Sequence, residues 1–103
     1  MFKKKNILVI GDIMLDQYCF GNVERISAEA PVPIVDIKKT ISKPGGASNV
    51  AQNLSTLGMN VFLLGITGDD PDLKELIKVL RLSNIKFDPV KDLNIRTTVK
   101  LRI

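Results

Sequence analysis

The order of apolar and polar positions along the chain predicts alternating strands and helices. Residues 7–10 and 61–64 are continuous apolar runs rich in branched side chains, as in strands buried on both faces of a parallel sheet. Apolar residues at three- and four-residue spacing predict helices at residues 47–57 and 71–80. Pro71 suits the first turn of the second helix, because the N–H that proline lacks would have no hydrogen-bond partner within the helix there.

Shorter β segments complete the pattern. Residues 18–23 and 32–37 are expected to form short strands, and because Pro31 and Pro33 remove ladder donors, the second should be an edge strand or lie outside the main sheet. Two further strands are expected at the end of the chain, at residues 85–87 and 96–103. With right-handed crossovers, this order of elements predicts an α/β layer.

The predicted layer is incomplete. A strand as apolar as residues 7–10 needs helices on both faces of its sheet and strands on both sides. Two helices and about three core strands cannot supply that cover. The chain therefore has the pattern expected for the first third of a larger doubly wound domain.

Composition excludes several classes of protein. The 103 residues allow one domain or less, and a hydrophobic content of 45% indicates a folded chain. No apolar run approaches the roughly 20 residues that span a bilayer, and the run after the lysines at 3–5 is too short for a signal peptide. With Cys19 as the single cysteine and no histidine, neither an internal disulfide nor a zinc site is expected. We expect a cytoplasmic protein without a membrane partner.

The net charge of +4 leaves two interpretations open. Much of the basic excess lies near the two ends of the chain. Because the chain has only five aromatic residues and no basic helix, a solvated surface is favoured and no nucleic-acid partner is expected. An anionic small substrate is the second interpretation.

The pair Gly45–Gly46 is the strongest functional signal in the sequence. Without a Cβ, the backbone here can come within contact distance of a ligand. A helical pattern follows at once, so free N–H groups at the positive end of the helix dipole suit hydroxyls, carboxylates or phosphates. The alternative is a simple turn before a helix, with Ser48 or Asn49 as its cap.

The spacing of the glycines resembles a known family. From Gly45, the string Gly-Gly-Ala-Ser-Asn-Val-Ala is followed by six residues, Gly58, nine more residues and Gly68. This resembles the N-terminal signature of the ribokinase (PfkB-type) carbohydrate kinases. The runs at residues 6–16, 25–34 and 97–103 look like those of bacterial D-glycero-β-D-manno-heptose-7-phosphate kinases. The resemblance implies the N-terminal portion of a ribokinase-like doubly wound sheet, spanning residues 1–103, with a small β lid at about 17–38 and 95–103.

Two aspartates follow the first strand. Asp12 and Asp16 are expected just past its carboxyl end, where open α/β sheets bind ligands and where a carboxylate can accept hydrogen bonds from sugar hydroxyls. The resemblance assigns Asp16, together with Gly45, Gly46 and Asn49, to the sugar. Asp12 is a further substrate contact or a turn residue.

Two cations lie on the predicted lid strand. Lys100 and Arg102 alternate with apolar residues over 96–103. The resemblance implies that both are candidate substrate contacts on a lid that excludes water from the sugar. An ordinary amphipathic strand with one solvent-exposed face explains the same alternation.

The part of the family that performs catalysis has no counterpart in the sequence. The catalytic aspartate of these kinases lies in a C-terminal Gly-Ala-Gly-Asp motif whose glycines stabilise developing phosphate charge. The chain lacks that motif. The resemblance therefore implies no catalytic residue here, and ATP and Mg²⁺ as cofactors of the complete enzyme that this chain alone does not bind tightly.

The interpretation that follows is the sugar-binding part of a kinase that phosphorylates heptose 7-phosphate at C1 with ATP, in ADP-heptose synthesis for lipopolysaccharide. We expect a truncated or split product, inactive alone, with a phosphorylated sugar as its ligand. Its protein partner would be a second copy bound through the β lid or a complementing C-terminal kinase fragment. A non-catalytic sugar-phosphate-binding or dimerisation module stays open. A dinucleotide-binding fragment is disfavoured, since no Gly-x-Gly-x-x-Gly follows the first strand.

Overall fold

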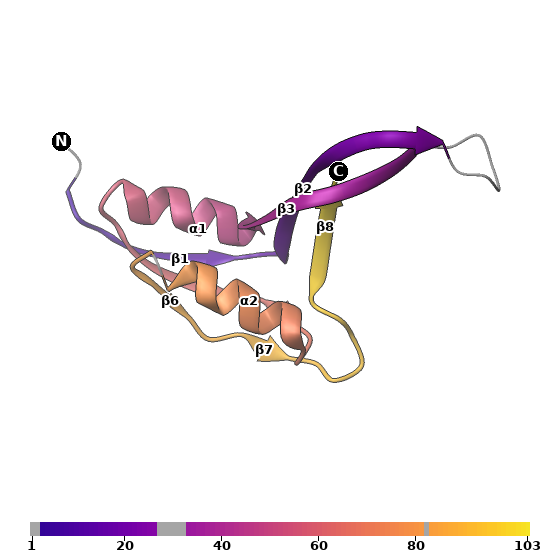
Figure 1. Cartoon of the computed structure of the whole chain (residues 1–103). Coiled ribbons are helices and arrows are strands. Elements are labelled where there is room, and N and C mark those ends of the chain that lie inside the picture. The colour runs from indigo at the N-terminus through magenta and orange to yellow at the C-terminus, as the bar shows by residue number, and fades with distance from the viewer. Residues whose placement is uncertain (1–2, 27–32, 82) are drawn as a thin grey trace.

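A computed structural model describes residues 3–26, 33–81 and 83–103, which form three small sheets and two helices (Figure 1). In chain order the elements are β1 (Asn6–Ile10), β2 (Ile13–Ile26), β3 (Pro33–Gly46), α1 (Ala47–Thr56), β4 (Asn60–Leu64), β5 (Ile66–Thr67), α2 (Pro71–Leu80), β6 (Ile85–Phe87), β7 (Val90–Lys91) and β8 (Thr98–Arg102). The mixed α/β class predicted from the sequence is confirmed.

The main layer is a parallel sheet in the order β1-β4-β6, with both helices packed on one of its faces. Successive strands are added on the same side of the sheet, and crossovers of one hand then place their helices on the same face. That face contributes alternate strand residues to the core. The buried residues of this core cluster are Ile13, Leu15, Ala51, Met59, Val61, Leu63, Leu76 and Leu80.

The opposite face of this sheet has no cover in the part of the chain that the structure describes. Leu8 and Ile10 of β1 are 60% and 67% exposed, and their parallel partners Phe62 and Leu64 of β4 are 39% and 37% exposed. Parallel sheets in α/β proteins are normally buried on both faces. The sequence-based expectation of apolar strands without enough covering helices is confirmed.

The β excursion is longer than the sequence predicted. β2 and β3, of 14 residues each, form an antiparallel hairpin that projects from the layer, and β8 pairs parallel with β2 (Figure 1). Strand structure extends back to Ile13 because the base of the hairpin is part of the core, with Ile13 and Leu15 fully buried. The predicted edge position holds for Pro33, which begins β3 at the edge of the β3-β2-β8 sheet. Pro31 lies outside the described residues.

A third, two-stranded sheet was not predicted. β5 and β7 pair in parallel just beyond the main layer, in a stretch expected to be turn. Strands of two residues are too short to produce an alternating pattern. Their hydrogen bonds, from the N–H groups of Val90 and Asp92 to the carbonyls of Gly65 and Thr67, are made between segments about 25 residues apart in sequence.

Asp70 joins α2 to the start of β8. Its Oδ1 accepts a hydrogen bond from the Leu73 N–H at 2.9 Å, as an N-cap, and its Oδ2 accepts one from the Thr97 N–H at 2.8 Å. Burial alone would raise the pKa of Asp70. The hydrogen bonds from Thr97 and Leu73 and the charge of Arg96 outweigh burial, so the pKa lies below its ordinary value of 3.8.

Replacing this cap should have a pH-dependent effect on stability. We expect Asp70→Ala to lower the free energy of unfolding by about 1–2 kcal/mol at pH 7, measured by urea denaturation. Because the folded-state pKa is depressed, the ionised group stabilises the fold above pH 3.8, and that contribution is lost as the pH falls through the folded pKa. The difference between wild type and variant should therefore shrink below pH 3.8.

The matched control for this prediction is Asp69→Ala. Asp69 is the neighbouring carboxylate, its only described ion pair is a half-exposed one with Lys91 at 3.8 Å, and such pairs contribute about 0–1 kcal/mol. An equal loss in both variants, or a loss at Asp70 that is the same at pH 3 and pH 7, would contradict the capping role.

Candidate functional site

The glycine pair lies where the hairpin meets the first helix. Gly46 ends β3 and is the N-cap of α1, with φ of 57°, and it has no side-chain cap. The next residue, Ala47, donates its N–H to the carbonyl oxygen of Asp12 at 2.7 Å. The start of α1 is thereby attached to the turn between β1 and β2. The predicted glycine-to-helix junction is confirmed, and neither Ser48 nor Asn49 caps the helix.

Ser48 holds this junction together from inside. Its side chain is fully buried, and Oγ lies within hydrogen-bond distance of the carbonyl oxygens of Gly45 and, at 3.2 Å, Met14. One hydroxyl therefore contacts β2, β3 and α1 together. From the sequence, Ser48 was predicted only as a possible cap. A small polar residue directly after Gly-Gly-Ala was the one available signal for this positioning role.

Asp16 lies diagonally across the hairpin from Gly45, which is in register with Met14. Asp16 comes six residues after the end of β1 and is the fourth residue of β2, because the hairpin begins at Ile13. A Cβ at position 45 would lie 2.5 Å from Oδ1 of Asp16 and 2.8 Å from Cγ of Met14. Only glycine leaves room here for the carboxylate. The structure thus brings Asp16 and Gly45 into direct proximity.

The Asp16 carboxylate has an unused hydrogen-bonding position. Its Oδ1 is buried and has no hydrogen-bond partner among the residues that the structure describes. An unpaired buried acceptor costs about 1–3 kcal/mol and is rare in native proteins, so it needs an explanation. A ligand hydroxyl is a donor that would satisfy it.

Three cations lie on the same face of the β3-β2-β8 sheet as this carboxylate. Asp16 is in register with Lys43 of β3 and Lys100 of β8, and Tyr18, two residues along, is in register with Arg102. The Lys43 ammonium lies 5.5 Å from the centroid of the Tyr18 ring, and the Arg102 guanidinium lies 6.0 Å from it. The arrangement can attract an anion while one carboxylate accepts hydroxyl hydrogen bonds.

Lys43 was missed in the sequence analysis. Its sequence signal was its place directly before Pro44 and the glycine pair. Its position opposite Asp16 follows from the pairing register of β2 with β3. That register could not be read from local periodicity.

Asp12 and Asn49 lie outside the two strands that carry Asp16 and Gly45. The exposed Asp12 lines a hollow of about 690 Å³ at the carboxyl end of β1, formed by Ile10, Gly11, Asp12, Ile13, Met14, Gly65, Ile66, Asp92, Ile95 and Thr98. Asn49 is exposed in the first turn of α1. Neither Asp16 nor the glycine pair lines the hollow. Gly46 ends β3, and the next residue, Ala47, donates its N–H to the carbonyl of Asp12, which lines the hollow. The hollow and the β3-β2-β8 sheet therefore meet at this junction.

Neither a metal cluster nor a membrane-spanning helix is present in the described ranges. Within residues 3–26, 33–81 and 83–103, no group of three or more His, Cys, Asp or Glu side chains is arranged to hold a metal ion. In that same part of the chain, no helix has the length and apolar character needed to cross a membrane.

A glycine pair that opens a helix beside a sheet bearing one carboxylate and three cations is an arrangement suited to binding a polar ligand such as a sugar, as in a sugar kinase. Residues 4–103 match the family model described as pfkB family carbohydrate kinase, and the chain belongs to that family. The resemblance stated from the glycine spacing is confirmed.

Individual relatives agree with the family match. The chain is 47% identical over 102 residues to the bifunctional protein HldE of Blochmanniella pennsylvanica and 46% identical to that of Proteus mirabilis, with 99% of this chain covered in each case. Among solved structures, a carbohydrate kinase from Agrobacterium tumefaciens is 27% identical, with a TM-score of 0.73 over 96% of this chain. The ribokinase-like fold is therefore established.

The chain is much shorter than these relatives. It spans 21% and 22% of the two HldE proteins, where it matches their N-terminal region, and 31% of the solved kinase.

Proposed function

We propose that this chain is the sugar-binding module of an ATP-dependent kinase that phosphorylates D-glycero-β-D-manno-heptose 7-phosphate at C1. The observation that carries the proposal is the buried Oδ1 of Asp16, which has no partner among the described residues, next to Gly45 and in register with Lys43 and Lys100. The identity to HldE proteins and the heptose-kinase-like run at residues 25–34 favour a heptose phosphate as the sugar. The pathway would be ADP-heptose synthesis in the cytoplasm.

Each site residue has a distinct part in this proposal. Asp16 accepts hydrogen bonds from sugar hydroxyls, while Gly45 and Gly46 allow the backbone to approach the ring. The Asn49 amide both donates and accepts hydrogen bonds at the start of α1.

The cations would serve the phosphate that the substrate already carries. Lys43, Lys100 and Arg102 lie on the face of the lid that bears Asp16, and they raise the local concentration of an anionic sugar. The lid sheet would cover the sugar and keep water from competing for the transferred phosphoryl group.

The nucleotide and its metal do not fit the residues of this chain. The part that the structure describes offers no cluster of acidic ligands, and the sequence has no Gly-Ala-Gly-Asp motif. In our proposal the remainder of the kinase holds ATP and Mg²⁺ and supplies the general base.

The site assignment is testable in a joined protein, made of this chain followed by the part of the Proteus mirabilis relative beyond the matched region. We expect Asp16→Ala and Asn49→Ala each to raise the KM for heptose 7-phosphate about 5- to 150-fold, since each unpairs polar groups in the bound state. The KM for ATP should stay within about twofold of its original value, because the proposal places no nucleotide contact at either position.

A control and a charge variant sharpen this test. Gln17→Ala alters the neighbouring residue on the other face of β2, where its amide contacts Ser42, and should leave both KM values unchanged. Lys43→Ala should weaken use of the phosphorylated sugar more than use of the same sugar without its phosphate. If the Asp16 and Asn49 variants change ATP use and leave sugar use alone, the assignment is wrong.

A second candidate function is dimerisation through the lid. Phe20 and Ile37 of the hairpin are large apolar side chains that are about half exposed, as in a protein interface. We expect the chain to sediment as a dimer that Phe20→Lys dissociates, whereas Leu93→Lys, at an 83%-exposed loop residue, leaves it intact. A monomer at about 100 µM, a concentration at which even weak interfaces form, would contradict this candidate. A dimer insensitive to Phe20→Lys would contradict it as well.

A further inference from the structure

The ring of Tyr18 holds two cations beside a carboxylate with which neither is paired. The Lys43 ammonium and the Arg102 guanidinium lie 5.5 and 6.0 Å from the ring centroid, and they come from the strands on opposite sides of β2. Lys43 is nevertheless in register with Asp16, two residues before Tyr18 and on the same face of the sheet. Among the residues that the structure describes, Asp16 makes no ion pair with Lys43 or with Lys100, its partner on β8. Lys43 therefore contacts the aromatic ring and not the carboxylate that faces it.

The two contacts open to Lys43 are similar in strength. An exposed ion pair changes an equilibrium constant by no more than about fivefold, and many such pairs contribute nothing. A cation within about 6 Å of an aromatic centroid gains about two- to fivefold at an exposed site, and more where water is excluded. The ring of Tyr18 is therefore able to hold a lysine that would otherwise pair with Asp16.

A phosphate group is a stronger partner than the ring. Hydrogen bonds between charged groups are shorter and about twice as strong as those between neutral groups, and a guanidinium donates two at once to a phosphate. A phosphorylated sugar whose hydroxyl bonds to Asp16 meets two cations that the ring holds near the carboxylate but apart from it. Lys43 and Arg102 can then leave the ring for the phosphate.

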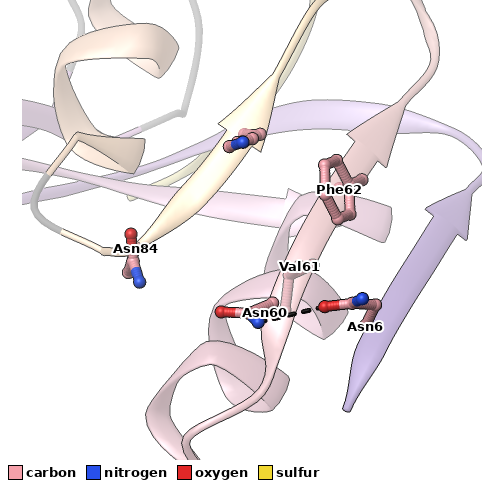
Figure 2. A pocket seen from close by; sticks show the side chains of 6 residues that line it. Asn6, Asn60, Val61, Phe62 and Asn84 are labelled. Carbon is pink, nitrogen blue, oxygen red and sulfur yellow. Dashed lines mark hydrogen bonds between the residues drawn. The ribbon is translucent and has the colours of Figure 1, made fainter. Parts of the chain in front are cut away.

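A second lysine–ring contact in the described residues provides a comparison. The Lys86 ammonium lies 5.3 Å from the Phe62 centroid, and Lys86 is in register with Phe62 itself, not with a carboxylate. Figure 2 shows the hollow of about 250 Å³ beside this pair, lined also by Asn6, Asn60 and Asn84 and by no acidic residue. The Asn60 amide donates to Oδ1 of Asn6 at 3.0 Å. Phe62 and Lys86 are therefore a matched control for Tyr18 and Lys43.

We propose that Tyr18 is a positioning residue for the selection of a phosphorylated sugar. In the free protein its ring holds Lys43 and Arg102 away from Asp16, and the phosphate of a bound sugar draws both cations off the ring. One face of a small sheet thereby keeps a carboxylate for hydroxyls and cations for phosphate. The inference rests on the proposed function, because it assigns the phosphate of that substrate to these two cations.

The kinetic test uses the joined protein, with heptose 7-phosphate and the same sugar without its phosphate. Tyr18→Leu should raise the KM for both sugars about three- to fivefold, because the released Lys43 then pairs with Asp16. Lys43→Ala added to Tyr18→Leu should return the KM for the unphosphorylated sugar to within about twofold of its original value, while the KM for heptose 7-phosphate stays raised. A merely structural role for Tyr18 would give additive losses without this recovery, and would overturn the proposal.

Two further variants separate the ring from its surroundings. Tyr18→Phe is the conservative variant, and because it keeps the ring, both KM values should stay within about twofold of the original. Phe62→Leu removes a ring beside a lysine that faces no carboxylate, and should leave the use of both sugars unchanged. A loss in Tyr18→Phe equal to that in Tyr18→Leu would assign the effect to the hydroxyl and overturn the proposal.

The free arrangement can be measured in the 103-residue chain, which has a single tyrosine. A proton held over an aromatic ring resonates upfield, so the methylene protons next to the Lys43 ammonium should be shifted upfield in NMR spectra. Tyr18→Leu should remove that shift. Inorganic phosphate should reduce it, whereas sodium chloride at the same ionic strength should not. The Lys86 signal should lose its shift only in Phe62→Leu. A Lys43 signal without the shift, or one that phosphate leaves unchanged, would overturn the proposal.

The outcomes separate this inference from the proposed function. A joined protein that phosphorylates heptose 7-phosphate but shows additive losses at Tyr18 and Lys43 retains the function and overturns the role of Tyr18. A joined protein without activity on heptose 7-phosphate overturns the proposed function. The response of the Lys43 signal to inorganic phosphate, which needs no heptose, then decides the role of Tyr18.

Discussion

Valine at position 46 is expected to destabilise the joined protein by about 3–5 kcal/mol and to remove its sugar kinase activity, because strain at the backbone and a steric clash add together. Gly46 has φ of 57°, a region in which a β-branched residue is an outlier. A Cβ here would also collide with the carbonyl oxygen of Asp12, the group that accepts the Ala47 N–H and holds the start of α1.

Gly58→Val separates the two causes. Gly58 has φ of 92°, yet a Cβ there would meet nothing within 4 Å. This variant should show backbone strain alone, about 1–3 kcal/mol, with sugar KM unchanged. Urea denaturation and sugar kinetics of the two variants provide the comparison. Equal losses at the two glycines would mean that the contact with Asp12 contributes nothing.

The second large effect is on turnover. The 103-residue chain should show no ATP-dependent phosphorylation of heptose 7-phosphate above background in an ADP-release assay. Its sequence lacks the Gly-Ala-Gly-Asp motif, and loss of a general base alone typically lowers a rate by about 10²–10⁴. Joining the chain to the remainder of the Proteus mirabilis relative should bring turnover back.

The control for this prediction is Asp16→Ala in both proteins. In the joined protein it should weaken sugar use, and in the chain alone it should change nothing. Steady-state turnover by the chain alone that Asp16→Ala abolishes would contradict the assignment of catalysis to the remainder of the kinase.

Local patterns were sufficient for the elements of the main layer. The strands at β1, β4 and β6 and both helices were predicted from apolar runs, helical spacing and Pro71, because each of these signals acts over a few residues. The glycine junction was predicted for the same reason. The lengths of β2 and β3 were underestimated, since the base of the hairpin is held as strand by burial in the core and not by its own alternation.

The candidate site, too, was predicted only where the signal is local in the sequence. Asp16, Gly45 and Asn49 were named from the family resemblance, but the place of Asp16 in the lid sheet and the contribution of Lys43 were not foreseen. Both depend on the pairing of β2 with β3 and β8, over separations of up to about 85 residues, and pairing register is a long-range property.

By itself, the sequence determined the α/β class, the helix that starts at Gly46 and membership of the carbohydrate kinase family, because local spacing carries each of these. Only the tertiary structure decided that both helices share one face of the sheet, which leaves Leu8, Ile10, Phe62 and Leu64 exposed above a row of asparagines. The physical reason is that helix placement follows from the order in which strands join the sheet, and strand order is set by contacts between distant segments.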